Sequence, residues 1–234
     1  VAVKAHHPSR VKRRHARGKQ PEFPADAGSS RACQIAALEP AACYAELEHR
    51  GLHFRKAAPS PGVREPVRLE GPVGGVLYRT DYPDTKRRTV PIEVFDCRLV
   101  LALAELGPIL TAHDITEVRI FSAWRPPPRG FPDGKFGNAH TGGLAADLRL
   151  FTKSDGTELS VLKDSHGRIG AVPCGAGAVP PSPETPAARE LRAIYCAAAD
   201  ARLFHVLLSP NFNVPHQNHF HVEVRPGVRW FIVR

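Results

Sequence analysis

The sequence Asn138-Ala-His140-Thr-Gly-Gly143-Leu-Ala145-Ala-Asp147-Leu-Arg-Leu150 combines two potential metal ligands with the alternation of a β-strand. Side chains on a strand point alternately to its two faces. If residues 144–150 form a strand, Asp147 shares one face with Ala145, and the leucines share the other. His140 precedes this strand, and the glycines between them would let the backbone turn His140 toward Asp147. The stretch therefore predicts a strand with one apolar face and one face that carries ligands.

A second stretch, Asn218-His219-Phe220-His221-Val222-Glu223, shows the same alternation near the end of the sequence. In a strand over residues 218–224, both histidines and the glutamate would share a face, with apolar residues behind them. Side by side, the two strands would bring His140, Asp147 and His221 to one ion. Two imidazoles and one carboxylate leave a fourth position for water, which is the pattern of a catalytic zinc site. We therefore predict one Zn²⁺ per chain, bound by these three residues.

Each of the two patterns has a plainer interpretation when it is taken alone. Two histidines that alternate on a strand more often form a surface or structural pair than a metal site. The spacing between His140 and Asp147 is also a weak signal by itself. The conjunction of both patterns with the local glycines and alanines favours metal binding.

These residues resemble a family of zinc enzymes. The pattern His140-x-x-Gly143-x-Ala145-x-Asp147, followed by His219-Phe-His221, resembles the zinc metallopeptidases that group lysostaphin, D-alanyl-D-alanine peptidases and hedgehog domains. The pattern His216-x-x-His219-x-His221 is similar to the penicillin-insensitive murein endopeptidases. The wider frame resembles the extensin-like C-terminal domain of bacteria over roughly residues 41–225. That frame includes Phe95-Asp96-Cys97-Arg98, Ser122-Ala-Trp-Arg125 and the segment 207–221.

The resemblance implies a hedgehog/D-Ala-D-Ala peptidase-like fold and zinc-dependent hydrolysis of peptide bonds in peptidoglycan. The enzyme would be of the murein endopeptidase or D,D-carboxypeptidase type, with peptidoglycan peptides as its substrate. The resemblance also implies that the second histidine of the pair His219/His221 is the ligand. The alternative function is a non-catalytic, zinc-containing domain that binds the cell wall or a partner. Asn138 departs from the pattern of the group, which usually has serine at this position.

Three further residues are candidates for catalysis beside the predicted ion. His219 would share the ligand face with His221, and an imidazole titrates near neutrality, so we expect it to move the proton from water to the leaving amine. His216 would act as its proton partner or as a donor to the tetrahedral intermediate. Arg125 would bind a substrate carboxylate or stabilise an oxyanion, or it would form a structural ion pair. Glu223 would orient a neighbouring group or be merely an exposed acid.

The remaining pattern predicts an α+β domain with a small antiparallel sheet, helices on one face and the zinc site on the other. Helices are expected over 41–50, about 95–106 (ended by Gly107-Pro108) and about 186–201. Further strands are expected over 67–70, 75–79, 116–124, 203–208 and 228–233. Residues 126–138 form a long loop rich in proline and glycine, which we expect to be a wall or lid of the site.

The positive charge of the chain is concentrated at its N-terminus. The net charge is +9, and residues 1–20 hold seven basic residues and no acidic one. We therefore expect residues 1–31 to be a basic, flexible arm and residues 32–234 to form a single domain. The arm would contact an anionic polymer or would be only a solvated linker. The rest of the chain lacks the basic and aromatic pattern of a nucleic-acid surface, so we expect no specific nucleic-acid binding.

The five cysteines fit an oxidising compartment better than the cytosol. Among the possible pairings we favour Cys43 with Cys97 and Cys174 with Cys196, which leaves Cys33 unpaired. No apolar run is long enough to span a bilayer. The sequence starts without methionine, so we expect an exported, periplasmic or extracellular protein whose signal peptide has been removed. We also expect it to be a monomer.

Overall fold

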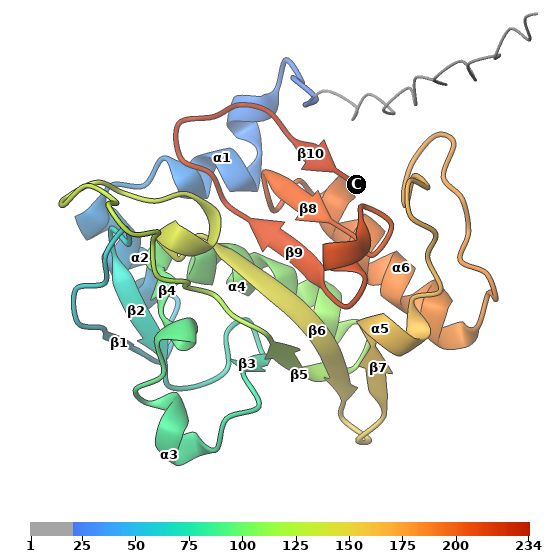
Figure 1. Ribbon diagram of the computed structural model, residues 1–234, viewed down its shortest axis with the longest axis horizontal. Helices are drawn as coiled ribbons and strands as arrows, with labels where there is room; N and C mark the ends of the chain where they lie inside the picture. Colours follow the sequence, from blue (N-terminus) through green and yellow to red (C-terminus); the bar gives the residue numbers. More distant parts are fainter. Residues whose placement is uncertain (1–20) are drawn as a thin grey trace, which may run out of the picture.

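The computed structural model describes residues 21–234, which form an α+β fold with two sheets (Figure 1). The strands are β1 (Phe54–Lys56), β2 (Pro66–Leu69), β3 (Leu77–Arg79), β4 (Phe95–Asp96), β5 (Ile115–Ile120), β6 (Ala145–Lys153), β7 (Glu158–Ser160), β8 (Val206–Leu208), β9 (Phe220–Glu223) and β10 (Ile232–Val233). The α-helices are α1 (Arg31–Ala36), α2 (Pro40–His49), α3 (Asp84–Arg87), α4 (Cys97–Thr111), α5 (Val161–Asp164) and α6 (Pro186–Asp200). The 3₁₀ helices are η1 (Ala27–Ser29), η2 (Pro91–Glu93), η3 (Ala139–Gly142) and η4 (Val214–His216).

The main sheet has seven strands, in the order β10-β8-β9-β6-β5-β3, with β7 paired to the far end of β6. The central pairs β8–β9, β9–β6 and β6–β5 are antiparallel. The edge pairs β10–β8 and β3–β5 are parallel, so the sheet is larger and more mixed than the small antiparallel sheet that we predicted. The pair β3–β5 is parallel because α4 connects its two strands as a crossover helix. Strands β1, β2 and β4 form the smaller antiparallel sheet.

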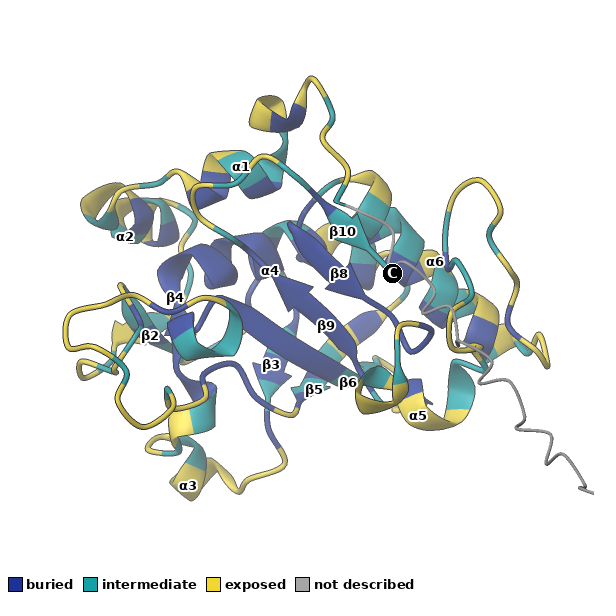
Figure 2. Cartoon of the chain, turned by 45° about the horizontal axis from the view of Figure 1, so that its top comes forward, coloured by how far each residue is buried: buried dark blue, intermediate teal, exposed yellow. Residues whose placement is uncertain are grey.

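The hydrophobic core lies on one face of the main sheet. Ala146 and Leu148 of β6 are buried in the main hydrophobic cluster together with apolar residues of α4 and α6. Asp147 lies between these two residues in β6, and its side chain contacts histidines instead of that cluster. Helix α4 passes behind the central strands in Figure 1, and these strands are buried along most of their length (Figure 2). The predicted separation of an apolar face from a ligand-bearing face is therefore present in β6.

Helix α4 is longer than the sequence predicts. It begins after Asp96, whose side chain caps its first turn, and it continues through Gly107 and Pro108 to Thr111. A Gly-Pro pair usually ends a helix. Here the glycine makes room for another segment, because a Cβ at position 107 would lie 2.2 Å from the carbonyl oxygen of Gly74. Gly107 therefore serves close packing rather than termination.

Helix α6 matches the prediction closely. Thr185 is its N-cap and accepts the N–H of Ala188, and Pro186 is its first residue. Leu191, Ile194, Tyr195 and Ala198 are buried and form the inward face of the helix. No helix in residues 21–234 is long and apolar enough to cross a membrane.

Two disulfides hold segments of the fold together. Cys43 pairs with Cys97 and links α2 to α4, and Cys174 pairs with Cys196 and links an irregular segment to α6. Cys33 is free. The favoured pairing is therefore confirmed.

The end of the predicted arm contacts the C-terminal part of the fold. Residues 1–20, which carry the basic charge and the predicted contact with an anionic polymer, lie outside the described residues. Glu22 forms an antiparallel bridge with Phe231, and Ala27 and Ala32 are buried against the same phenylalanine. This bridge and this small apolar cluster attach the segment that follows residue 21 to the C-terminal part of the fold, and the division predicted at residue 31 stays a prediction.

Candidate metal centre

The pairing of β6 with β9 places two predicted ligands side by side. In this antiparallel register Asp147 is opposite His221, and Nδ1 of His221 lies 3.1 Å from Oδ1 of Asp147. Both residues are buried, with exposures of 1% and 7%. The sheet register therefore sets the distance between these two groups.

His140 reaches the same carboxylate from outside the strands. It lies in η3, and Gly143 reverses the chain at the end of this turn with a φ of +64°. Nε2 of His140 lies 3.1 Å from Oδ1 of Asp147, and its Nδ1 lies 2.7 Å from the carbonyl oxygen of Ala123. A carbonyl oxygen only accepts hydrogen bonds, so Nδ1 carries the proton. The lone pair of the neutral ring is therefore on Nε2, toward Asp147.

Two more histidines complete the cluster. Nε2 of His219 lies 3.2 Å from Oδ1 of Asp147, and its Nδ1 lies 2.7 Å from the side-chain oxygen of Asn218. The ring of His216 packs on those of His219 and His221, with centroid distances of 5.1 and 5.8 Å. The predicted ligands and both predicted proton carriers therefore come together around one carboxylate.

The charges in this cluster are strongly coupled. Burial alone would raise the pKa of Asp147, but hydrogen bonds with His140, His219 and His221 outweigh it and hold that pKa far below its usual range. Burial, together with the positive charges of His219 and His221, lowers the pKa of His216 to about 4. His216 is therefore a neutral base at pH 7, whereas Asp147 is a permanent anion.

The donor set fits a divalent metal ion. Two groups of side chains present ligand atoms within 4.8 Å of one another: His140, Asp147 and His221, and His216, His219 and His221. In the first group, the 3.1 Å contact between Nε2 of His140 and Oδ1 of Asp147 is favourable only when a proton or a cation lies between the two atoms, because a neutral His140 with its proton on Nδ1 would turn a lone pair toward an oxygen that also only accepts. A mixed set of imidazoles and one carboxylate suits zinc. The residues present could therefore hold the predicted ion, with His221 common to both groups.

Arg125 forms an ion pair with the predicted ligand Asp147. Its guanidinium contacts Oδ2 of Asp147, and its Nε donates to the hydroxyl of Ser122 at 2.9 Å. This contact is the structural ion pair that we predicted as one of the roles of Arg125. The side chain is still 53% exposed, so contact with a substrate stays a prediction.

Glu223 lies behind His221 in the same strand. Its exposure is 2%, which excludes the interpretation as an exposed acid. Its carboxylate lies 3.6 Å from Nε2 of His221 and 2.7 Å from the guanidinium of Arg225. Burial would raise the pKa of Glu223, but its contacts with His221 and Arg225 lower it. An ionised Glu223 favours a proton on Nε2 of His221 and leaves Nδ1 free to bind a metal.

The loop 126–138 begins and ends at the cluster. The N–H of Arg125 donates to the carbonyl of His140 at 3.1 Å, which closes the base of the loop. With residues 56–66 the loop lines a hollow of about 560 Å³. None of the cluster residues lines this hollow, so a wall or lid of the site stays a prediction.

Sequence reasoning missed the groups that hold the histidines in place. They are the carbonyl of Ala123 and the side chains of Asn213 and Asn218. Asn213 and His216 are three residues apart across η4, a spacing that sequence inspection could have found. The Ala123 carbonyl carries no sequence signal, because every residue has one.

Comparison with known proteins identifies the family. A profile of the extensin-like protein C-terminus matches residues 41–232, and the chain belongs to this family. Searches of curated proteins and of solved structures gave no match.

Proposed function

We propose that this protein is a zinc-dependent peptidase that hydrolyses peptide bonds in peptidoglycan. The proposal is carried by one observation, the convergence of three imidazoles on one oxygen of the buried Asp147. Such a cluster on the ligand face of a sheet is suited to metal-assisted hydrolysis. The substrate class comes from the sequence resemblance to murein endopeptidases, not from the geometry.

His140, Asp147 and His221 would hold the zinc ion. The carbonyl of Ala123 fixes the ring of His140, and the carboxylate of Glu223, 3.6 Å from Nε2 of His221, favours a proton on that nitrogen. In their neutral forms both imidazoles would then present a lone pair to the cluster. Zinc at this position would supply a Lewis acid that activates water for attack on a carbonyl.

His219 is the proposed carrier of the proton. Its Nδ1 is held by Asn218 and its Nε2 faces the cluster, so Nε2 can take up a proton and release it to a leaving amine. His216 lies against it, and its Nδ1 is 2.6 Å from the side-chain oxygen of Asn213. With this oxygen as acceptor, Nε2 of the neutral His216 has a lone pair. That lone pair suits a proton partner of His219 better than a donor to the tetrahedral intermediate.

We further propose that the protein works as an exported monomer outside the cytoplasm. The two disulfides fit an oxidising compartment, where they form and persist.

Digestion of purified peptidoglycan, with mass spectrometry of the products, tests the proposed activity. We expect new amine ends with the native protein and none after removal of metal with a chelator, and restored cleavage after zinc is added back. The products would also distinguish an endopeptidase from a carboxypeptidase. A zinc-loaded protein that releases no product would contradict the proposal and favour the non-catalytic, ligand-binding domain.

A further inference from the structure

A groove opens beside the cluster where strand β6 changes its neighbour. On this edge of β6, the pairing with β9 reaches only Leu148 and the pairing with β7 begins at Leu150. On the other edge, Leu148 and Leu150 pair with successive residues of β5, so the strand is bulged between them. Arg149 therefore has no cross-strand partner on either edge of β6. Bulges re-aim side chains and are frequent next to active sites.

The groove has a volume of about 510 Å³ and reaches from the start of β9 to α5. Its walls include Phe121, Arg149, Leu162, Lys163 and Asn218. Two of these side chains are apolar and well exposed, Phe121 at 39% and Leu162 at 61%. The groove therefore offers both cationic groups and apolar contacts to a ligand.

The groove adjoins the predicted proton carrier. The side chain of Asn218 contacts Nδ1 of His219, and Phe121 packs edge-on against the ring of His219 with a centroid distance of 5.8 Å. The guanidinium of Arg149 lies 5.3 Å from the centroid of the same Phe121 ring. Arg149 is thus separated from His219 by one aromatic ring.

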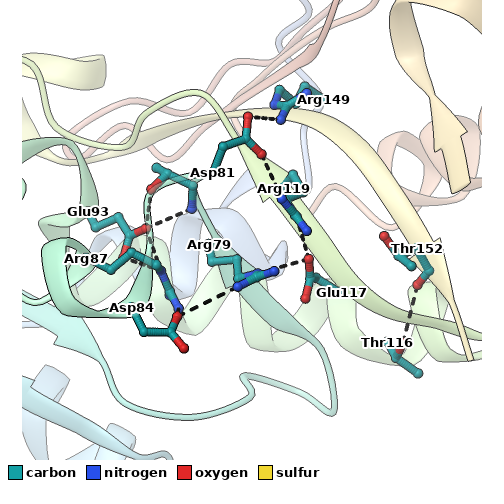
Figure 3. A network of polar contacts seen from close by, with 11 residues as sticks. Arg79, Asp81, Asp84, Arg87, Glu93, Thr116, Glu117, Arg119, Arg149 and Thr152 are labelled. Atoms are coloured by element: carbon teal, nitrogen blue, oxygen red, sulfur yellow. Dashed lines mark hydrogen bonds and ion pairs between the residues drawn. The ribbon is translucent and has the colours of Figure 1, made fainter. Parts of the chain in front are cut away.

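A chain of ion pairs holds the guanidinium of Arg149 in place (Figure 3). Its guanidinium contacts Asp81, which also binds Arg119 at 2.9 Å. The chain continues from Arg119 through Glu117 to Arg79. Asp81 shares its charge between two guanidinium groups, so Arg149 is held in place but is not fully neutralised. A preorganised guanidinium is well suited to bind a carboxylate.

Besides Arg149, the charged residues that line the groove are one base, Lys163, and two acids, Glu158 and Asp164. The backbone N–H of Lys163 donates to the hydroxyl of Ser160, but its ammonium group has no hydrogen-bond or ion-pair partner among the described residues. The carboxylate of Asp164 accepts the N–H of Ser160. Glu158 pairs with Thr152 in the sheet, three residues beyond Arg149, or about 10 Å along the strand. Glu158 is thus remote from the end of the groove that adjoins His219.

We propose that this groove binds a peptide through a free carboxylate, with Arg149 as the main anion-binding residue and Lys163 as its helper. The inference rests on the proposed function, because the groove would then receive the part of the substrate that lies on the His219 side of the scissile bond. It makes Arg149 a determinant of specificity and not a catalytic residue.

Binding of soluble peptidoglycan peptides tests this proposal. Two fluorescent preparations would be compared, one unmodified and one with its carboxyl groups converted to amides. Anisotropy in the first seconds after mixing gives the affinity before hydrolysis matters. We expect the native protein to bind the unmodified peptides about tenfold or more tightly than the amidated ones. Arg149→Gln should abolish this preference, and Lys163→Gln, at an exposed position, should reduce it.

Arg119→Gln is the matched control, because Arg119 shares Asp81 with Arg149 but does not line the groove. The Arg119→Gln variant should keep the preference for unmodified over amidated peptides. Equal affinity of the native protein for both preparations would overturn the proposal, as would a preference that survives in Arg149→Gln. Absence of hydrolysis with the preference intact would contradict only the proposed peptidase activity and would still support the carboxylate-binding groove.

Discussion

Asp147 and His221 are cross-strand partners, and the nitrogen of one lies 3.1 Å from the oxygen of the other. A slip of this pairing by one residue would turn every side chain of one strand to the opposite face. Here it would replace an imidazole with an apolar group and bury the imidazole in the core. The register of the sheet and the geometry of the candidate metal centre are therefore a single property of this fold.

Replacement of His219 by alanine separates the two possible ligand sets. If His140, Asp147 and His221 hold the ion, His219→Ala keeps about one zinc per chain and lowers kcat by about 10²–10⁴-fold, because a proton carrier is lost. Zinc content and peptidoglycan cleavage are measured together. His49→Ala serves as a control, because the side chain of His49 is 84% exposed. Loss of zinc from His219→Ala would assign the ion to His216, His219 and His221 instead.

Replacement of Gly143 by alanine should destabilise the fold by about 1–3 kcal/mol or more. The residue has a φ of +64°, and an added Cβ would lie 2.9 Å from the backbone nitrogen of Asp96. That nitrogen donates to the carbonyl of Gly143 at 2.8 Å, so the clash also strains this hydrogen bond. Gly156→Ala is the matched control, with a φ of +86° but nothing within 4 Å of its Cβ. Unfolding in denaturant gives both values, and equal losses would rule out the proposed clash.

His205 should make the fold sensitive to mild acid. Burial lowers the pKa of His205 to about 4, although the carboxylate of Glu223 opposes this shift. The unfolded chain therefore binds a proton more readily, and stability falls as the pH drops from about 6.5 toward 4. From pH 7 to pH 5 this residue should cost about 2 kcal/mol of unfolding free energy.

His205→Asn provides the comparison for this pH effect. An asparagine side-chain oxygen can accept the N–H of Arg225, as Nδ1 of His205 does at 3.1 Å, but it does not titrate. Denaturant unfolding at pH 7 and pH 5 should show a smaller loss for the variant than for the native protein. Identical losses in both proteins would mean that another group controls the acid sensitivity.

The sequence predicted the parts of this protein that follow from local periodicity. Alternation placed Asp147 and His221 on the ligand faces of their strands, and the helix expected over about 186–201 is α6, Pro186–Asp200. These features depend on neighbours along the chain, which the sequence displays directly.

Features that depend on distant packing were missed. The extension of α4 past Pro108 depends on a close approach of Gly74, a residue far away in the sequence. The bulge at Arg149 depends on a mismatch with β5, and the burial of Ala27 and Ala32 depends on Phe231, near the C-terminus. No local sequence pattern reveals these contacts, because each joins two segments that are far apart in the sequence.

Zinc content of the purified protein tests the central claim most directly. Elemental analysis of the native protein should give about one zinc per chain, and His221→Ala should lose it, because His221 belongs to both ligand sets. His49→Ala should retain the metal. If the native protein contained no zinc and took none up on addition of the ion, the account built on His140, Asp147 and His221 would be contradicted.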